Sequence, residues 1–91
     1  MEALPEIDFA TFILSMGSSA LSHLGEVPDD AGKTERNLPL AKQTIDLLAL
    51  LQEKTKGNLD EAETSLLSAL LYDLRIKYVD ALKKAGGGSA T

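Results

Sequence analysis

An uncharged stretch near the start of the chain restricts its fold more than any other feature. Phe9 to Leu24 spans sixteen residues and contains no side chain that is charged at neutral pH. It is too apolar to stay uncovered in water. It is also hydroxyl-rich and shorter than the roughly 20 apolar residues that a membrane-spanning helix needs. The rest of the chain, or a second copy of it, must therefore cover this stretch.

The composition favours helices. The chain has 91 residues, enough for one small domain. Leu occurs seventeen times, whereas Ile and Val together occur six times. Unbranched side chains keep more rotamer freedom in a helix than β-branched ones, which predicts an all-α fold. The chain contains no Cys, which excludes disulfides and thiolate chemistry. The absence of Cys fits a reducing compartment, and we therefore expect a cytoplasmic location.

The charge distribution argues against three kinds of partner or destination. The net charge is −5, and the first 32 residues carry six acidic side chains and no Lys or Arg. Binding to nucleic acids or to anionic lipids requires clustered basic groups. A signal peptide begins with basic residues, whereas acidic residues precede the apolar stretch here. We therefore predict no nucleic-acid partner, no membrane association and no export signal.

Local signals place the first of three predicted helices over the uncharged stretch. Asp8 is a good N-cap for a helix over residues 9–24, which Gly25 would end. Gly17 and Ala20 are small enough for another helix to approach closely. Hydroxyl side chains form a stripe opposite the apolar face of this helix. They predict close packing of small residues rather than catalysis, since no second His or Lys is placed to activate a nucleophile. They are Thr11, Ser15, Ser18 and Ser22.

Two further helices are predicted over residues 38–56 and 61–84. Asn37 is the N-cap of the second, and Asp60 with Glu63 forms a capping box at the start of the third. The connection between these helices is so short that they must form an antiparallel hairpin. We expect the uncharged first helix to pack on this hairpin. The remaining segments, residues 1–7 and 85–91, are predicted to be flexible tails on a single helical domain, residues 8–84.

The second predicted helix has too much apolar surface for one chain to cover. Its polar side is narrow, and a helix of that kind is buried on more than one side. We therefore expect a homo-oligomer, most simply a dimer, with the first or second helix in the interface. The residues predicted for this interface are Phe9, Phe12, Ile13, Met16, Gly17, Ala20, Leu40, Leu47 and Leu51.

Motifs that would carry chemistry are incomplete. Gly32-Lys33-Thr34 resembles the end of a phosphate-binding loop, but six residues rather than four separate Gly32 from Gly25, and a helix precedes it instead of a strand. His23 is the single histidine, and Glu26 is the carboxylate near it. These two groups are too few for a metal within one chain, although symmetry could double them. We predict no catalytic, cofactor or metal site.

One polar pair has a possible structural role. Folding the predicted hairpin about its turn brings Asp46 within about 7.5 Å, along the helix axis, of Arg75. The two side chains are either separate solvated charges or a salt bridge across the hairpin or between subunits.

Several strings of residues resemble the bacterial domain-of-unknown-function family 1844. The resemblance covers about residues 8–82 and implies a small bacterial cytoplasmic protein. It implies no activity and no catalytic residue. The matching strings are Ile45 to Leu48, Lys54 to Leu59, Leu70 to Arg75 with Tyr78, and, nearer the start, Phe9, Ser15, Ala20, Leu21, His23 to Gly25, Gly32-Lys33 and Asn37-Leu38.

The predicted function is a non-enzymatic helical module that associates with itself and docks a protein partner. The alternative is a small-ligand or enzymatic site at a subunit interface, which would use His23, the loop over residues 25–37 or Asp46. Membrane-surface binding is disfavoured because acidic residues precede the one uncharged helix.

Overall fold

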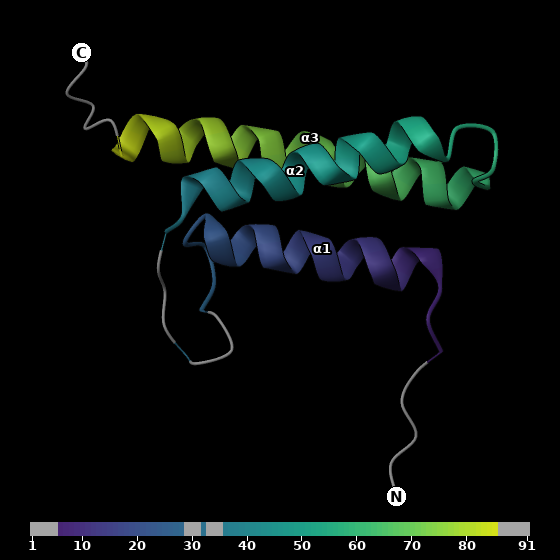
Figure 1. Cartoon of the computed structure of the whole chain (residues 1–91), viewed down its shortest axis with the longest axis horizontal. Helices are drawn as coiled ribbons and strands as arrows, with labels where there is room; N and C mark the ends of the chain where they lie inside the picture. The colour runs from purple at the N-terminus through teal and green to yellow at the C-terminus, as the bar shows by residue number, and fades with distance from the viewer. Residues whose placement is uncertain (1–5, 29–31, 33–35, 86–91) are drawn as a thin grey trace, which may run out of the picture.

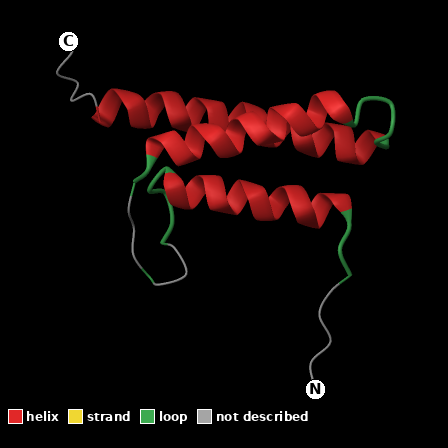
Figure 2. Cartoon of the chain, viewed as in Figure 1, coloured by secondary structure: helices red, strands yellow, loops and turns green. Residues whose placement is uncertain are grey.

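The computed structural model describes residues 6–28, 32 and 36–85, which contain three α-helices and no strand (Figure 2). The helices are α1 (Phe9–His23), α2 (Leu38–Lys54) and α3 (Glu61–Ala85). Each helix contacts both others. In Figure 1, α2 runs antiparallel to α1 and to α3. The predicted all-α fold, the hairpin of the second and third helices and the packing of the first helix on that hairpin are confirmed.

The helices begin where the sequence predicts because polar side chains satisfy the free amides of each first turn. The Thr11 backbone N–H donates to Asp8 Oδ1 over 2.7 Å, and the Leu40 N–H donates to Asn37 Oδ1 over 3.2 Å. At the start of α3 the capping box is reciprocal. The Glu63 N–H donates to Asp60 Oδ1 over 2.8 Å, and the Asp60 N–H donates to Glu63 Oε1 over 2.9 Å.

Three helix ends differ slightly from the prediction, and α3 ends one residue late at Ala85. Helix α1 ends one residue early at His23, and Gly25 follows with a φ of 80°. Helix α2 ends two residues early at Lys54. There, both the backbone N–H and the hydroxyl of Thr55 donate to the Leu51 carbonyl, over 2.9 and 2.7 Å. The chain then reverses through Gly57, whose φ of 86° suits a residue without a Cβ.

The core lies between the three helices. Helix α1 approaches α3 most closely at Gly17, where an added Cβ would lie 2.9 Å from Leu70 Cδ1. The close approach that small residues predict is therefore made within one chain. Aliphatic residues from all three helices and from the end of α1 are buried in this core: Ile13, Ala20, Leu24, Ala41, Ile45, Leu48, Leu67, Leu71, Leu74 and Ala81.

The end of the bundle opposite the hairpin turn is held by two long-range hydrogen bonds. The Asn37 backbone N–H donates to the His23 carbonyl over 2.7 Å, which joins the start of α2 to the end of α1. The Arg36 guanidinium donates to the Ala81 carbonyl over 3.2 Å. Because Ala81 lies in the last turns of α3, this cation also complements the negative end of the helix dipole.

Some predictions concern residues outside this description. The predicted tails fall mostly on residues 1–5 and 86–91, and Lys33 and Thr34 of the incomplete phosphate-loop motif also lie outside the described residues. Of the predicted tail residues that are described, Ile7 is exposed and Ala85 is the last residue of α3. None of the described helices combines the length and apolar character needed to cross a bilayer.

Candidate functional site

The polar residues singled out in the sequence do not gather into one site. His23 lies half-buried at the end of α1, and Glu26 and Gly32 are exposed. In the part of the chain that the structure describes, no three His, Cys, Asp or Glu side chains lie close enough together to hold a metal ion.

Asp46 has a partner on its own helix. Its Oδ2 lies 2.8 Å from Lys42 Nζ, one helical turn away. The hydrogen bond and the charge of this carboxylate raise the pKa of Lys42. Arg75 is exposed and lines a groove with other residues of α3, and none of the ion pairs among the described residues joins it to Asp46, so the predicted bridge across the hairpin is not formed. The intersubunit form of that bridge stays a prediction.

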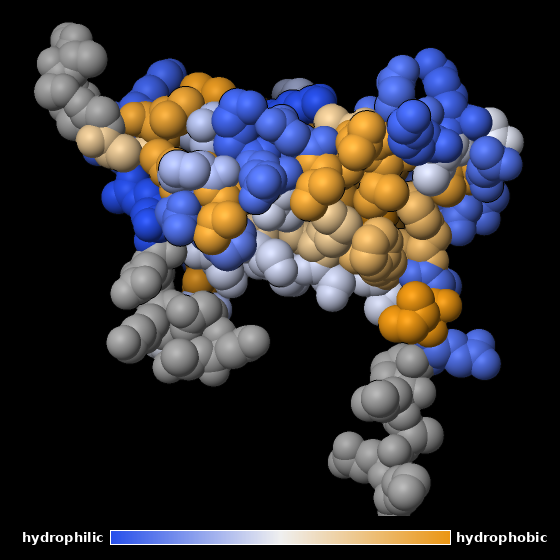
Figure 3. Space-filling view, in the orientation of Figure 1, coloured by the Kyte–Doolittle hydropathy of each residue, from blue (hydrophilic) through white to orange (hydrophobic). Residues whose placement is uncertain are grey.

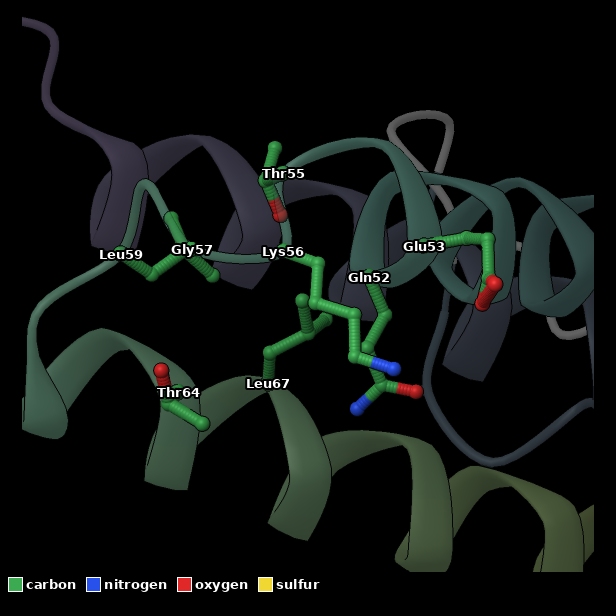
Figure 4. Close-up of a pocket in the computed structure, with 8 residues that line it drawn as sticks. All are labelled: Gln52, Glu53, Thr55, Lys56, Gly57, Leu59, Thr64 and Leu67. Atoms are coloured by element: carbon green, nitrogen blue, oxygen red, sulfur yellow. The ribbon is translucent and has the colours of Figure 1, made fainter.

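A pocket lies where α2 and α3 meet at the hairpin turn (Figure 4). In Figure 4 the Leu67 side chain rises from α3 toward the centre of the pocket, and the side chains of Lys56 and Gln52 converge from the opposite side. The residues that line it are Gln52, Glu53, Thr55, Lys56, Gly57, Leu59, Thr64 and Leu67.

Most of the polar groups in this hairpin pocket already hold structural hydrogen bonds. The Thr55 hydroxyl donates to the Leu51 carbonyl, as described above, and the Thr64 hydroxyl donates to the Asp60 carbonyl over 2.9 Å. The Gln52 amide donates to Ser68 Oγ over 3.2 Å. The lining residues include no nucleophile hydrogen-bonded to a base, which covalent catalysis needs. They offer a small cleft in which Lys56 is a cation for an anionic group.

Two larger features of the surface are apolar. The first, which we call the α1/α2 face, consists of the exposed side chains Phe12, Leu40, Leu47 and Leu50. Figure 3 shows apolar side chains gathered over the C-terminal half of α2 and the N-terminal half of α1. These four side chains are 41–52% exposed, so no other part of the described chain covers this face fully.

The second feature is the outer face of α3, made of Tyr72, Ile76 and Val79. Their exposed fractions are 70, 51 and 49%. A shallow groove runs along this face and is also lined by the charged residues Arg75, Asp80 and Lys83. The interface predicted from sequence does not include this face. The signal that could have revealed it is the spacing of four and three residues between its apolar members.

A comparison with protein-family models matches residues 6–80 to a domain of unknown function, DUF1844. The chain belongs to the DUF1844 family. The match confirms the resemblance seen in the sequence and spans α1, α2 and most of α3. Searches of curated proteins and of solved structures gave no match. The family description names no activity, so the function of this DUF1844 domain has to be argued from its own surface.

The string from Lys54 to Leu59, on which that resemblance partly rests, has a structural explanation in this DUF1844 domain. It contains the last residue of α2 and the turn into α3. The Asn58 backbone N–H donates to the Thr55 carbonyl over 2.8 Å, and Leu59 packs against the core. Several residues of the string also line the hairpin pocket.

The residues predicted for an interface occupy three kinds of position in the DUF1844 domain. Ile13, Gly17 and Ala20 are buried in the core of the same chain. Phe9, Met16 and Leu51 are half-buried, whereas Phe12, Leu40 and Leu47 are exposed and belong to the α1/α2 face. A partner can therefore contact the last three directly, and the interface itself stays a prediction.

Proposed function

We propose that this DUF1844 domain is a non-enzymatic helical module that associates with itself and docks a protein partner. The observation that supports the proposal is the amount of apolar surface left on a chain that already has a complete core. Among the described residues, eleven large hydrophobic side chains are exposed, and they include members of both the α1/α2 face and the outer face of α3. Contiguous apolar patches rimmed by polar residues are typical of interaction surfaces.

Covering these residues would supply a substantial part of the free energy that association requires. Full burial of a Leu or Ile side chain contributes roughly 1.5–3 kcal/mol, so covering one that is half exposed contributes about 1 kcal/mol. Several such residues on one face therefore offset much of the cost of bringing two molecules together. The charged groups at the edges of these faces give the rim that keeps each chain in solution before it associates.

Self-association is tested by the mass of the protein in solution. Sedimentation velocity and light scattering, at protein concentrations from about 1 to about 200 µM, should give a mass that rises toward that of two chains. The mass of a single chain at every concentration would contradict this part of the proposal.

Small-ligand binding is the second candidate function, and the hairpin pocket is the observation that favours it. A thermal-shift series with phosphate, small carboxylates and nucleotides tests it. Binding at this pocket should raise the melting temperature of the wild type and not that of Lys56→Ala. Equal shifts in both proteins, or no shift in either, would contradict binding at this pocket.

A further inference from the structure

The outer face of α3 has a regular repeat as well as apolar character. Tyr72, Ile76 and Val79 follow one another at intervals of four and three residues, and Ala69 and Lys83 continue the same spacing in both directions. This alternation of three and four is the pattern by which one helix packs along another. The repeat covers two heptads and about 21 Å of the helix.

This repeat faces away from the rest of the chain. At about 100° per residue, Tyr72, Ile76 and Val79 lie roughly 140° around α3 from the buried Leu67, Leu71 and Leu74. The buried residues contact α1 and α2, and the outer residues line an open groove. Another helix can therefore lie along the outer face without displacing α1 or α2.

The residue types at each position fit a pair of helices. In heptad notation Ile76 and Lys83 occupy a positions, and Tyr72 and Val79 occupy d positions. Ile76 at a is a residue type that parallel two-stranded coiled coils use there, although Val79 and Tyr72 replace the Leu that such pairs usually have at d, so the number of strands is argued from Lys83. A single Lys at an a position fixes the register and the number of strands, because its ammonium group can reach water at the edge of a two-stranded interface.

Charged residues flank the repeat with opposite signs on its two sides. Arg75 occupies a g position, and Asp73 and Asp80 occupy e positions. When two copies of α3 lie parallel and in register, a g residue faces the e residue five positions further on in the partner. Arg75 of each copy then faces Asp80 of the other, in two symmetry-related pairs. An antiparallel arrangement would bring g next to g and e next to e, which places like charges together.

Both members of these pairs are available in the single chain. Among the described residues, Arg75 has no ion-pair partner. Asp80 Oδ2 lies 3.1 Å from Lys84 Nζ, and its second carboxylate oxygen can accept from another donor.

We propose that the outer face of α3 binds the same face of a second copy of this chain, with the two α3 helices parallel and in register. This inference rests on the self-association part of the proposed function, and it names the surface, the orientation and the residues. The α1/α2 faces of both copies stay uncovered in this dimer and are left for a different partner.

The short repeat is sufficient because α3 is already folded. An isolated helix of two heptads is marginal in water, since most of its interaction energy is spent on ordering the backbone. Here α1 and α2 hold α3 in its helical form before the second copy arrives. Association therefore orders only the side chains of the outer face and the rim.

Single cysteines test the surface and its orientation, because the chain contains no native Cys. Val79→Cys and Tyr72→Cys should each form a disulfide-linked dimer under mild oxidation, since d residues face their own counterparts in a parallel pair. Leu50→Cys is the matched control on the α1/α2 face and should stay monomeric on a denaturing gel. Antiparallel helices would instead place a residues against d residues, so cross-linking of a mixture of Ile76→Cys and Val79→Cys, with neither variant cross-linking alone, would overturn the parallel orientation.

Exchange of the flanking charges tests the register. Arg75→Asp should weaken the dimer about tenfold in sedimentation equilibrium, because two like-charge contacts replace two opposite-charge ones. The double variant, Arg75→Asp with Asp80→Arg, should recover most of that loss. A double variant that is weaker than Arg75→Asp alone would overturn the predicted contact.

A last pair of variants separates failure of this inference from failure of the proposed function. Ile76→Glu should give a monomer that still unfolds cooperatively, whereas Leu50→Glu should leave the dimer intact. The two sites have nearly equal exposed fractions, 51 and 52%. If Leu50→Glu dissociates the dimer and Ile76→Glu does not, the α3 surface is wrong and self-association stands. If the wild type is monomeric throughout, self-association fails as well.

Discussion

The two sides of α3 both carry apolar residues, but their surroundings are opposite. Leu67, Leu71 and Leu74 on the inner side are completely or almost completely buried against α1 and α2. The outer side contains Tyr72, Ile76 and Val79, whose exposed fractions lie between 49 and 70%. The inner side consists mainly of Leu, whereas the outer side combines β-branched and aromatic residues with flanking charges of both signs. The difference shows that hydrophobic spacing identifies a contact surface, but not whether the contact is within the chain or between chains.

The largest expected effect is a difference in unfolding free energy between substitutions on the inner side and on the outer side of α3. Leu74→Ala should lower the free energy of unfolding by about 2–5 kcal/mol, because it leaves a cavity in the core. Ile76→Ala should lower it by about 0.5 kcal/mol or less when the protein is dilute enough to be monomeric. Urea unfolding followed by circular dichroism gives both values. Similar losses for the two variants would contradict the separation into an inner and an outer side.

The contact of Gly17 in α1 with Leu70 in α3 tests how tightly the inner side of α3 is packed. Gly17→Leu should cost about 1–3 kcal/mol of unfolding free energy, because a Cβ at Gly17 already crowds the Leu70 side chain. Ser18→Leu is the control on the exposed side of the same helix and should change stability by less than about 0.5 kcal/mol. A neutral Gly17→Leu would show that α1 and α3 can separate here without loss.

Removal of the helix cap should lower the stability of the whole domain, since α3 is folded together with α1 and α2. Asp60→Ala deletes the acceptor for the Glu63 amide and should cost about 1 kcal/mol of unfolding free energy. Asp73→Ala removes an exposed ion pair with Lys77 and should cost a few tenths of that. Unfolding experiments on both variants, combined with measurements of dimer mass, check this prediction. An intact dimer in an otherwise destabilised Asp60→Ala protein would mean that the outer side does not depend on the first turn of α3.

The smallest expected effect is a change of stability with pH. The hydrogen bond from the Thr11 amide lowers the pKa of Asp8 below its ordinary value of 3.8. Because the folded pKa is the lower one, the stabilisation is complete above pH 3.8 and is lost as the pH falls through the folded pKa. Asp8→Asn keeps an acceptor that does not titrate, so its melting temperature should fall less steeply in acid than that of the wild type. Equal slopes would contradict this role of Asp8.

Local features of the fold could be predicted from the sequence because their causes are local. The caps at Asp8, Asn37 and Asp60, the reversal at Gly25 and the ion pair of Asp73 with Lys77 each depend on residues within four positions of one another. Their geometry follows once a helix forms. The predicted salt bridge across the hairpin was different, since it depended on how α2 and α3 are rotated about their axes. Asp46 instead pairs with Lys42, one turn away.

The candidate site was only partly predictable for the same reason. The sequence indicated that small residues in the first helix allow a close approach, but not which helix would approach. The structure places Leu70 of the same chain against Gly17, so Ile13 and Ala20 are enclosed in the core of their own chain. The repeat at Tyr72, Ile76 and Val79 was visible in the sequence, but the longer Leu pattern of the same helix hid it.

The sequence by itself determined that this chain forms three helices, where they begin and that two of them form a hairpin. Helix propensity, capping and connection length act over a few residues, so no knowledge of the packed molecule is needed. Only the tertiary structure decided which apolar residues are used up in the core and which are left exposed. That outcome depends on how the helices rotate to bury the most surface together. A helix such as α3, with apolar residues on two sides, buries one side within the chain and leaves the other exposed.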